Sequence, residues 1–142
     1  MRAIYLLHSV LLTLCLLAMP VAVATDAENA ATAMIKVFAA QNYVRTHEDA
    51  IVIDVRTPAE YELSHITGAL NVNVQDDTFA EMAATLDPDK TYIVHCTKNP
   101  AGGRSSRALE TLRDLGFKHL YSLEGGYVAW KEAQLPLTAA EH

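Results

Sequence analysis

The sequence predicts an α/β fold in which helices cover both faces of a parallel β-sheet. Short apolar runs of strand type alternate with helical patterns along most of the chain, an order typical of parallel strands joined by right-handed crossovers. The run from Ala50 to Val55 is apolar on both faces until Asp54, as expected of a central strand in a covered sheet. Such sheets bind ligands beyond the carboxyl ends of their strands, so the residues at those ends are the candidates for function.

The first two dozen residues are predicted to be an export signal. Arg2 gives the segment a positively charged start, and the stretch from Ala3 to Met19 is mostly apolar. Ala22-Val23-Ala24 fits the small-residue pattern at which signal peptides are cleaved. We expect a signal peptide over 1–24, cleavage after Ala24, and a periplasmic or secreted protein that is free of the membrane. The alternative is an uncleaved anchor, because the apolar stretch approaches the roughly 20 residues that span a bilayer.

Removal of this signal leaves 118 residues, which is enough for one domain. The full sequence has 17 acidic and 11 basic residues, and Arg2 is the one charge lost with the signal. This acidic balance argues against nucleic acid as a partner. Cys96 is the one cysteine left, so no internal disulfide can form. A single thiol in an oxidising compartment is either reactive or buried and inert.

The predicted elements divide the chain into a lead-in over 25–49, a domain core over 50–137 and a tail over 138–142. The lead-in is expected to be a helix from Thr25 to Val44, since Thr25 to Glu28 fits a capping box and apolar residues follow at helical spacing. A second helix is expected to begin at Thr57-Pro58-Ala59-Glu60, which combines an N-cap with an early proline and a carboxylate. The remaining strands are predicted over 69–74, 92–94 and 119–123. One further helix is expected to begin at a capping box at Thr78, and another to run over 104–115 with Gly116 as its C-terminal cap. The last helix is expected after Gly125-Gly126, with Trp130 in the core.

Cys96 follows a predicted strand and precedes a helix that begins near Arg104. Backbone N–H groups of the intervening loop can converge on an anion, and the helix N-terminus adds partial positive charge. Lys98 and Arg104 add two cations, so we expect a lowered thiol pKa and a nucleophilic thiolate. His95 invites a pairing with the cysteine, but strand alternation sends adjacent side chains to opposite faces. A buried, inert thiol is the alternative.

Four segments together closely resemble the rhodanese family of sulfurtransferases. They read VIDVRTPAEYELSHITGALNV at 52–72, YIVHC at 92–96, GGRSSRALETLRDLGF at 102–117 and LEGGYVAW at 123–130. The resemblance extends from about Ala50 to Pro136. It implies a three-layer fold with a parallel sheet of about five strands, and a cysteine at the base of a cradle-shaped loop.

The resemblance also implies an enzyme that carries sulfur as a persulfide on Cys96. The thiolate would attack the outer sulfur of a small donor such as thiosulfate and pass the sulfur to a thiol, cyanide or protein acceptor, without a metal or cofactor. Asp54 and Arg56 would support the loop from the neighbouring strand end. Arg104 would brace the loop from within. The residues expected to form the substrate-binding loop are Thr97, Lys98, Asn99, Ala101, Gly102, Gly103, Arg104 and Ser105.

The loop departs from the family in its length. Seven residues separate Cys96 from Arg104, whereas single-domain rhodaneses usually have four and related phosphatases and arsenate reductases have five. The extra residues near Lys98-Asn99-Pro100 must bulge outward or widen the pocket. Two alternatives stay open: a cysteine-based phosphatase or arsenate reductase, and a rhodanese-like module that binds a partner or carries sulfur without turnover. The physiological donor, the acceptor and the oligomeric state are not determined by the sequence.

Overall fold

The computed structural model describes residues 32–140. The predicted signal peptide over 1–24, its cleavage site and the capping box at Thr25 lie outside the described residues. Within 32–140, no helix combines the length and the apolar character needed to cross a membrane. Over the same range, no group of three or more His, Cys, Asp or Glu side chains is arranged to hold a metal ion.

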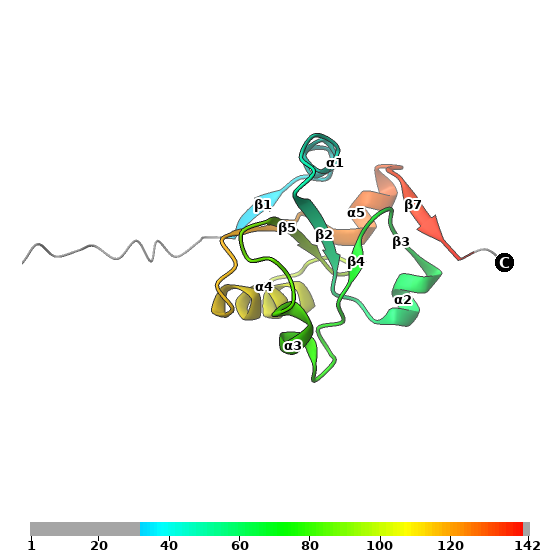
Figure 1. The fold of residues 1–142 in the computed structure, drawn as a ribbon. Coiled ribbons are helices and arrows are strands. Elements are labelled where there is room, and N and C mark those ends of the chain that lie inside the picture. The colour runs from blue at the N-terminus through cyan, green and yellow to red at the C-terminus, as the bar shows by residue number, and fades with distance from the viewer. Residues whose placement is uncertain (1–31, 141–142) are drawn as a thin grey trace, which may run out of the picture.

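Five parallel strands form the central sheet, in the order β1-β6-β5-β2-β4 (Figure 1). The middle strand β5 is buried at every residue, and its register with β2 sets His95 opposite Asp54. The residues that follow these two strands therefore lie at the same edge of the sheet. The predicted fold class is confirmed. The strands are β1 (Ala33–Ile35), β2 (Ala50–Asp54), β4 (Leu70–Asn71), β5 (Thr91–His95) and β6 (His119–Leu123).

Helices cover both faces of the sheet (Figure 1). Successive residues of each strand point to opposite faces, so Val52 and Ile93 belong to one apolar cluster, and Ile53 and Val94 belong to the other. The first cluster packs against α1 and α5, and the second packs against α3 and α4. The predicted three layers are present. The four helices are α1 (Val37–Thr46), α3 (Phe79–Ala83), α4 (Arg104–Asp114) and α5 (Gly126–Glu132).

A fifth helix, α2 (Pro58–Leu63), begins directly after β2. Thr57 Oγ1 accepts a hydrogen bond from Glu60 N at 3.3 Å, and Glu60 Oε2 accepts one from Thr57 N at 3.1 Å. The predicted capping box is confirmed. It leaves the Glu60 carboxylate at the edge of the sheet where β2 and β5 end.

The predicted helix over 25–44 is wrong in its middle part, because Ala33–Ile35 forms the edge strand β1. These residues pair in parallel with β6, from Ala33 opposite Tyr121 to Ile35 opposite Leu123. Pairing with β6 satisfies main-chain groups along that edge, a benefit that the spacing of apolar side chains does not reveal. The helix begins only at Val37.

Further differences concern the residues after β2 and the end of the chain. The predicted strand over 69–74 is reduced to Leu70–Asn71. Beyond it, Val72 N still donates to Asp54 O at 3.0 Å and Val74 N to Val55 O at 3.3 Å. The Asn71 side chain donates to the carbonyls of Asp54 and Arg56, both at 2.9 Å. The capping box expected at Thr78 does not form, because its hydroxyl donates to Asp76 Oδ1 at 2.7 Å. Part of the predicted tail is ordered: β7 (Leu137–Ala139) pairs antiparallel with β3 (Ser64–Ile66).

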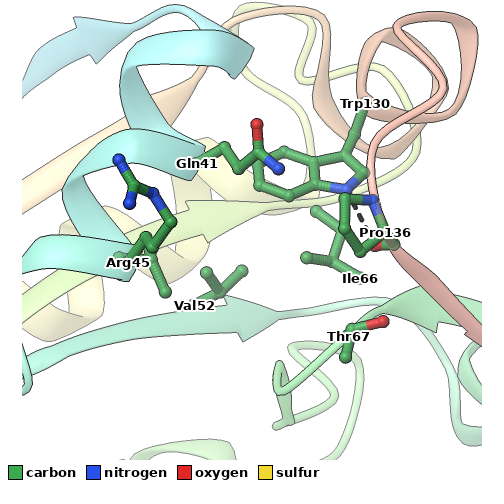
Figure 2. A pocket seen from close by; sticks show the side chains of 8 residues that line it. Gln41, Arg45, Val52, Ile66, Thr67, Trp130 and Pro136 are labelled. Carbon is green, nitrogen blue, oxygen red and sulfur yellow. Dashed lines mark hydrogen bonds between the residues drawn. The ribbon is translucent and has the colours of Figure 1, made fainter.

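A pocket of about 230 Å³ lies on the sheet face covered by α1 and α5. Figure 2 shows Val52, Ile66 and the indole of Trp130 around it, with Arg45 extending from α1. Trp130 is buried, as predicted for a core residue, and its Nε1 donates to Pro136 O at 3.1 Å. None of the predicted site residues lines this pocket.

The packing of α4 gives a testable difference between two leucines near its end. Leu112 is fully buried, whereas Leu115 is 37% exposed. We expect Leu112→Ala to lower the free energy of unfolding by about 2–5 kcal/mol, because a cavity would remain under the helix. Leu115→Ala is the matched control and should cost less than about 1 kcal/mol. Urea denaturation measures both values, and equal losses would contradict this packing.

Candidate active site

Cys96 is the first residue after β5, and only 3% of it is exposed. The N-terminus of α5 fixes the backbone around it: Tyr127 N donates to Cys96 O and Val128 N donates to Thr97 O, both at 3.0 Å. Gly126 permits this approach, because a Cβ there would lie 2.7 Å from Cys96 O and its φ is +60°. The sequence predicted Gly126 only as a helix start, but it also brings α5 against the cysteine.

Hydrogen-bond donors surround the Cys96 sulfur. Its Sγ lies 3.6 Å from Ser105 Oγ, in the first turn of α4. Burial by itself raises the pKa of the thiol. The Ser105 hydroxyl and the backbone N–H groups of Ser105, Asn99 and Lys98 together outweigh burial, so the pKa of Cys96 lies below that of an ordinary thiol. The sulfur is thus favoured as a thiolate by neutral donors and a helix N-terminus.

Asn99 turns its side chain inward beneath the loop. Its Oδ1 accepts a hydrogen bond from Cys96 N at 2.5 Å, and its Nδ2 donates to Val94 O at 3.1 Å and Ser122 Oγ at 3.2 Å. Its φ of +49° is one that asparagine adopts more readily than most residues. The sequence placed Asn99 among the substrate-binding residues, whereas in the structure its side chain ties the loop to β5 and β6.

The extra length of the loop lies on the outside of the molecule. Lys98, Pro100, Ala101 and Gly102 are exposed. Gly102 has a φ of +69°, and the chain returns through a hydrogen bond from Gly103 N to Pro100 O at 3.0 Å. A Cβ on Gly103 would lie 2.8 Å from Pro100 Cγ, so this return needs glycine. Of the two outcomes that the sequence left open, the structure has the outward bulge.

A bidentate ion pair joins the loop to α2. Arg104 Nη1 lies 2.6 Å from Glu60 Oε2, and Arg104 Nη2 donates to Glu60 Oε1 at 2.9 Å and to Thr97 Oγ1 at 2.8 Å. The Arg104 hydrogen bonds are the main reason that the pKa of Glu60 lies far below its ordinary value; burial opposes them, and Thr57 and Thr97 add to them. Arg104 therefore connects the beginning and the end of the loop to one carboxylate.

Glu60 is a site residue that the sequence analysis did not identify. It was assigned only to the helix cap, yet its Oε2 accepts from both Thr57 and Arg104. The signal that could have found it is its position. Glu60 is the third residue after the N-cap Thr57, and this cap follows directly after β2. Its carboxylate therefore lies at the edge of the sheet where the cysteine loop also lies.

Asp54 and Arg56 form a buried ion pair at the end of β2. Arg56 Nη2 lies 2.6 Å from Asp54 Oδ2, and Arg56 Nε donates to Asp54 Oδ1 at 3.0 Å. Arg56 also donates to Ser64 O at 2.9 Å, and its guanidinium carbon lies 4.1 Å from the centre of the Tyr127 ring. The pair links β2 to β3 and to α5, the helix whose N-terminus holds Cys96.

His95 is fully buried beside this ion pair. Its Nδ1 donates to Cys96 O at 3.0 Å, and its Nε2 lies 3.7 Å from Asp54 Oδ2. Burial is the main cause that lowers the pKa of His95, with Asp54 opposing it. The ring is therefore neutral near pH 7, and its proton is directed to the backbone of Cys96 rather than to the sulfur, which fits the expectation against a Cys–His pair.

The donors around the sulfur predict how the reactivity of Cys96 changes with pH. Alkylation of Cys96 by iodoacetamide should reach its half-maximal rate at a lower pH than an ordinary thiol. Ser105→Ala removes the hydroxyl 3.6 Å from Sγ, so it should move this midpoint to higher pH. Ser106→Ala is the control, because that hydroxyl lies 3.5 Å from Pro100 O instead. An unchanged midpoint in Ser105→Ala would contradict the role of its hydroxyl.

Known proteins with related sequences cover much of the described chain. Thiosulfate sulfurtransferase GlpE from Pseudomonas entomophila is 33% identical over 84 residues, which are 59% of this chain and 72% of that protein. Protein HIGH ARSENIC CONTENT 1, mitochondrial, from Arabidopsis thaliana is 35% identical over 91 residues, 57% of this chain and 52% of that protein. The chain thus spans only about half the length of the Arabidopsis relative.

The fold and the sequence identify the family. The crystal structure of a rhodanese-related protein from Thermoplasma volcanium aligns with a TM-score of 0.63 and 28% identity, and covers 75% of this chain and 97% of that one. The family model described as Rhodanese-like domain matches residues 39–133, a range that includes β2, the cysteine loop and α5. The chain therefore belongs to the rhodanese-like domain family.

Proposed function

We propose that this protein is a sulfurtransferase that carries sulfane sulfur as a persulfide on Cys96. The observation that supports this proposal most directly is the set of neutral donors around the Cys96 sulfur, which lowers the pKa of the thiol. A thiolate at neutral pH is the nucleophile that sulfur transfer requires. The similarity to a thiosulfate sulfurtransferase adds support at the level of the family.

In the first half of the reaction, the Cys96 thiolate attacks the outer sulfur of a donor such as thiosulfate. A new S–S bond forms to Cys96 while the S–S bond of the donor breaks, and its electron pair leaves with sulfite. The terminal sulfur on Cys96 then has one negative charge. The Ser105 hydroxyl and the N–H groups that favour the thiolate suit this persulfide for the same reason.

In the second half, an acceptor thiolate or cyanide attacks the terminal sulfur. The acceptor leaves as a persulfide or as thiocyanate, and the electron pair of the broken S–S bond returns to Cys96 as a thiolate. One sulfur atom moves from donor to acceptor, and Cys96 ends in its starting state. The cycle therefore consumes no external oxidant or reductant.

Intact mass spectrometry tests this proposal. We expect the purified protein to gain one sulfur atom after treatment with a sulfane-sulfur donor, either thiosulfate or methanethiosulfonate. Cyanide should then remove the sulfur with formation of thiocyanate. Cys96→Ser should gain none, while Ser106→Ala, which changes a hydroxyl directed to Pro100 O, should behave as the wild type.

Two results would contradict the proposed reaction. Failure of Cys96 to gain sulfur from either donor would favour a module that binds a partner without turnover. Release of phosphate from p-nitrophenyl phosphate, lost in Cys96→Ser and not accompanied by sulfur transfer, would favour a phosphatase.

We also propose that the protein works after export, in the periplasm or outside the cell. This proposal rests on the charge, the apolar stretch and the small residues of 1–24. N-terminal sequencing of the protein isolated from its own source should begin at Thr25. A sequence that begins at Met1 would contradict cleavage.

A further inference from the structure

Both arginines at the site are compensated by carboxylates. Arg104 bonds to both oxygens of Glu60, at 2.6 and 2.9 Å, and Arg56 lies 2.6 Å from Asp54. Lys98, the remaining cation of the loop, is exposed on the bulge. The immediate donors to the sulfur are therefore neutral groups, and the guanidinium charges beside them are already balanced.

Arg104 nevertheless lies near the sulfur, because it bonds to the residue after Cys96 and directly precedes Ser105, whose hydroxyl lies 3.6 Å from Sγ. The hydrogen bond to Glu60 is the main cause that raises the pKa of Arg104, and the negative charge of Cys96 raises this pKa further. Arg104 also donates to Thr97 Oγ1 at 2.8 Å, one residue beyond Cys96. A change in the Glu60–Arg104 pair must therefore change the electrostatic potential at Cys96.

Such a site separates sulfur donors by their charge. A persulfide or thiosulfonate brings one negative charge to the sulfur, whereas thiosulfate brings two. Phosphate and arsenate are mixtures of singly and doubly charged forms near neutral pH, and their doubly charged forms resemble thiosulfate. Neutral donors can hold a single charge well, as they do for the thiolate. A second charge would enter a nearly buried site whose two arginines are already paired with carboxylates, which is costly.

We propose that Glu60 makes the site selective for singly charged sulfane-sulfur donors, such as persulfides and thiosulfonates, over doubly charged tetrahedral anions such as thiosulfate, phosphate and arsenate. It does so by holding Arg104 in the bidentate ion pair. This inference rests on the proposed sulfur transfer at Cys96. Because Glu60 acts through Arg104, it is a positioning residue that determines specificity.

Two donors of nearly the same shape isolate the effect of charge. Methanethiosulfonate has a methyl group in place of one oxygen of thiosulfate, so it has one negative charge instead of two. With either donor, the Cys96 thiolate attacks the outer sulfur, and methanesulfinate or sulfite leaves with the electron pair. The ratio of the two rate constants for persulfide formation, measured by mass spectrometry of quenched samples, reports the charge selectivity of each variant.

Glu60→Gln is the decisive variant. Glutamine keeps the capping box, which accepts Glu or Gln at this position, but removes the charge that compensates Arg104. We expect the rate with thiosulfate, relative to methanethiosulfonate, to rise about tenfold, because an uncompensated guanidinium attracts the second charge. The gain should shrink as salt concentration rises.

Two further variants separate this effect from a general change in charge or structure. Glu62→Gln removes the same charge from an exposed position of α2 and should keep the wild-type ratio. Glu60→Gln combined with Arg104→Gln removes both partners and should return the ratio toward the wild type. A protection experiment tests the same effect without catalytic turnover. Inorganic phosphate should protect Cys96 from alkylation by iodoacetamide better in Glu60→Gln than in the wild type.

The outcomes distinguish this inference from the proposed function. An unchanged ratio and unchanged phosphate protection in Glu60→Gln would overturn the role of Glu60 while leaving sulfur transfer intact. An equal rise in Glu62→Gln would also overturn it, since the effect would then come from net charge alone. If the wild type gains sulfur from neither donor, the proposed function fails, and the phosphate protection still decides whether Glu60 controls the anion that the site accepts.

Discussion

The stabilisation of a negative sulfur at a nearly buried position is the constraint on which the site depends. Burial alone favours the neutral thiol, so the structure must supply enough donors to reverse that preference. Ser105 supplies a hydroxyl and a backbone N–H, and Lys98 and Asn99 supply two more N–H groups. These donors come from a loop and from the first turn of α4, which can converge on one atom only because β5 ends directly below them.

Three contacts from separate elements keep the loop in this shape. Asn99 ties it to the ends of β5 and β6 from below. The N-terminus of α5 binds the carbonyls of Cys96 and Thr97, while Glu60 on α2 holds Arg104 at the other end. Each of these groups follows a different strand, so the parallel sheet is what brings them to one edge. The support explains how a loop longer than usual for the family still presents its N–H groups to the sulfur.

The arrangement of charge gives this site a particular chemical character. Its two arginines are paired with carboxylates, and neutral donors surround its nucleophile. Neutral hydrogen-bond donors suit an anion with a single charge, such as the Cys96 thiolate. The charged groups instead position the loop, since Arg104 joins both of its ends to Glu60 on α2.

The agreement between sequence and structure is best where local rules and burial act together. Ala50–Asp54 is a central strand with apolar residues on both faces, and Thr57 with Glu60 forms a capping box that depends only on neighbouring residues. The prediction fails where a distant partner decides the outcome. Ala33–Ile35 has helical spacing but pairs with β6, and the strand predicted over 69–74 extends only over Leu70–Asn71, where it pairs with β2.

The same division applies to the site. By itself, the sequence determined that a single cysteine follows a buried strand and precedes a helix, because strand, loop and helix signals are local and the residue types that favour a thiolate are adjacent in the chain. Only the tertiary structure decided that Asn99 points inward, that the extra loop residues lie outside, and that Glu60 neutralises Arg104, 44 positions away in the sequence. These outcomes depend on which elements meet at the sheet edge, and that is fixed by the packing of the whole domain rather than by any short stretch of residues.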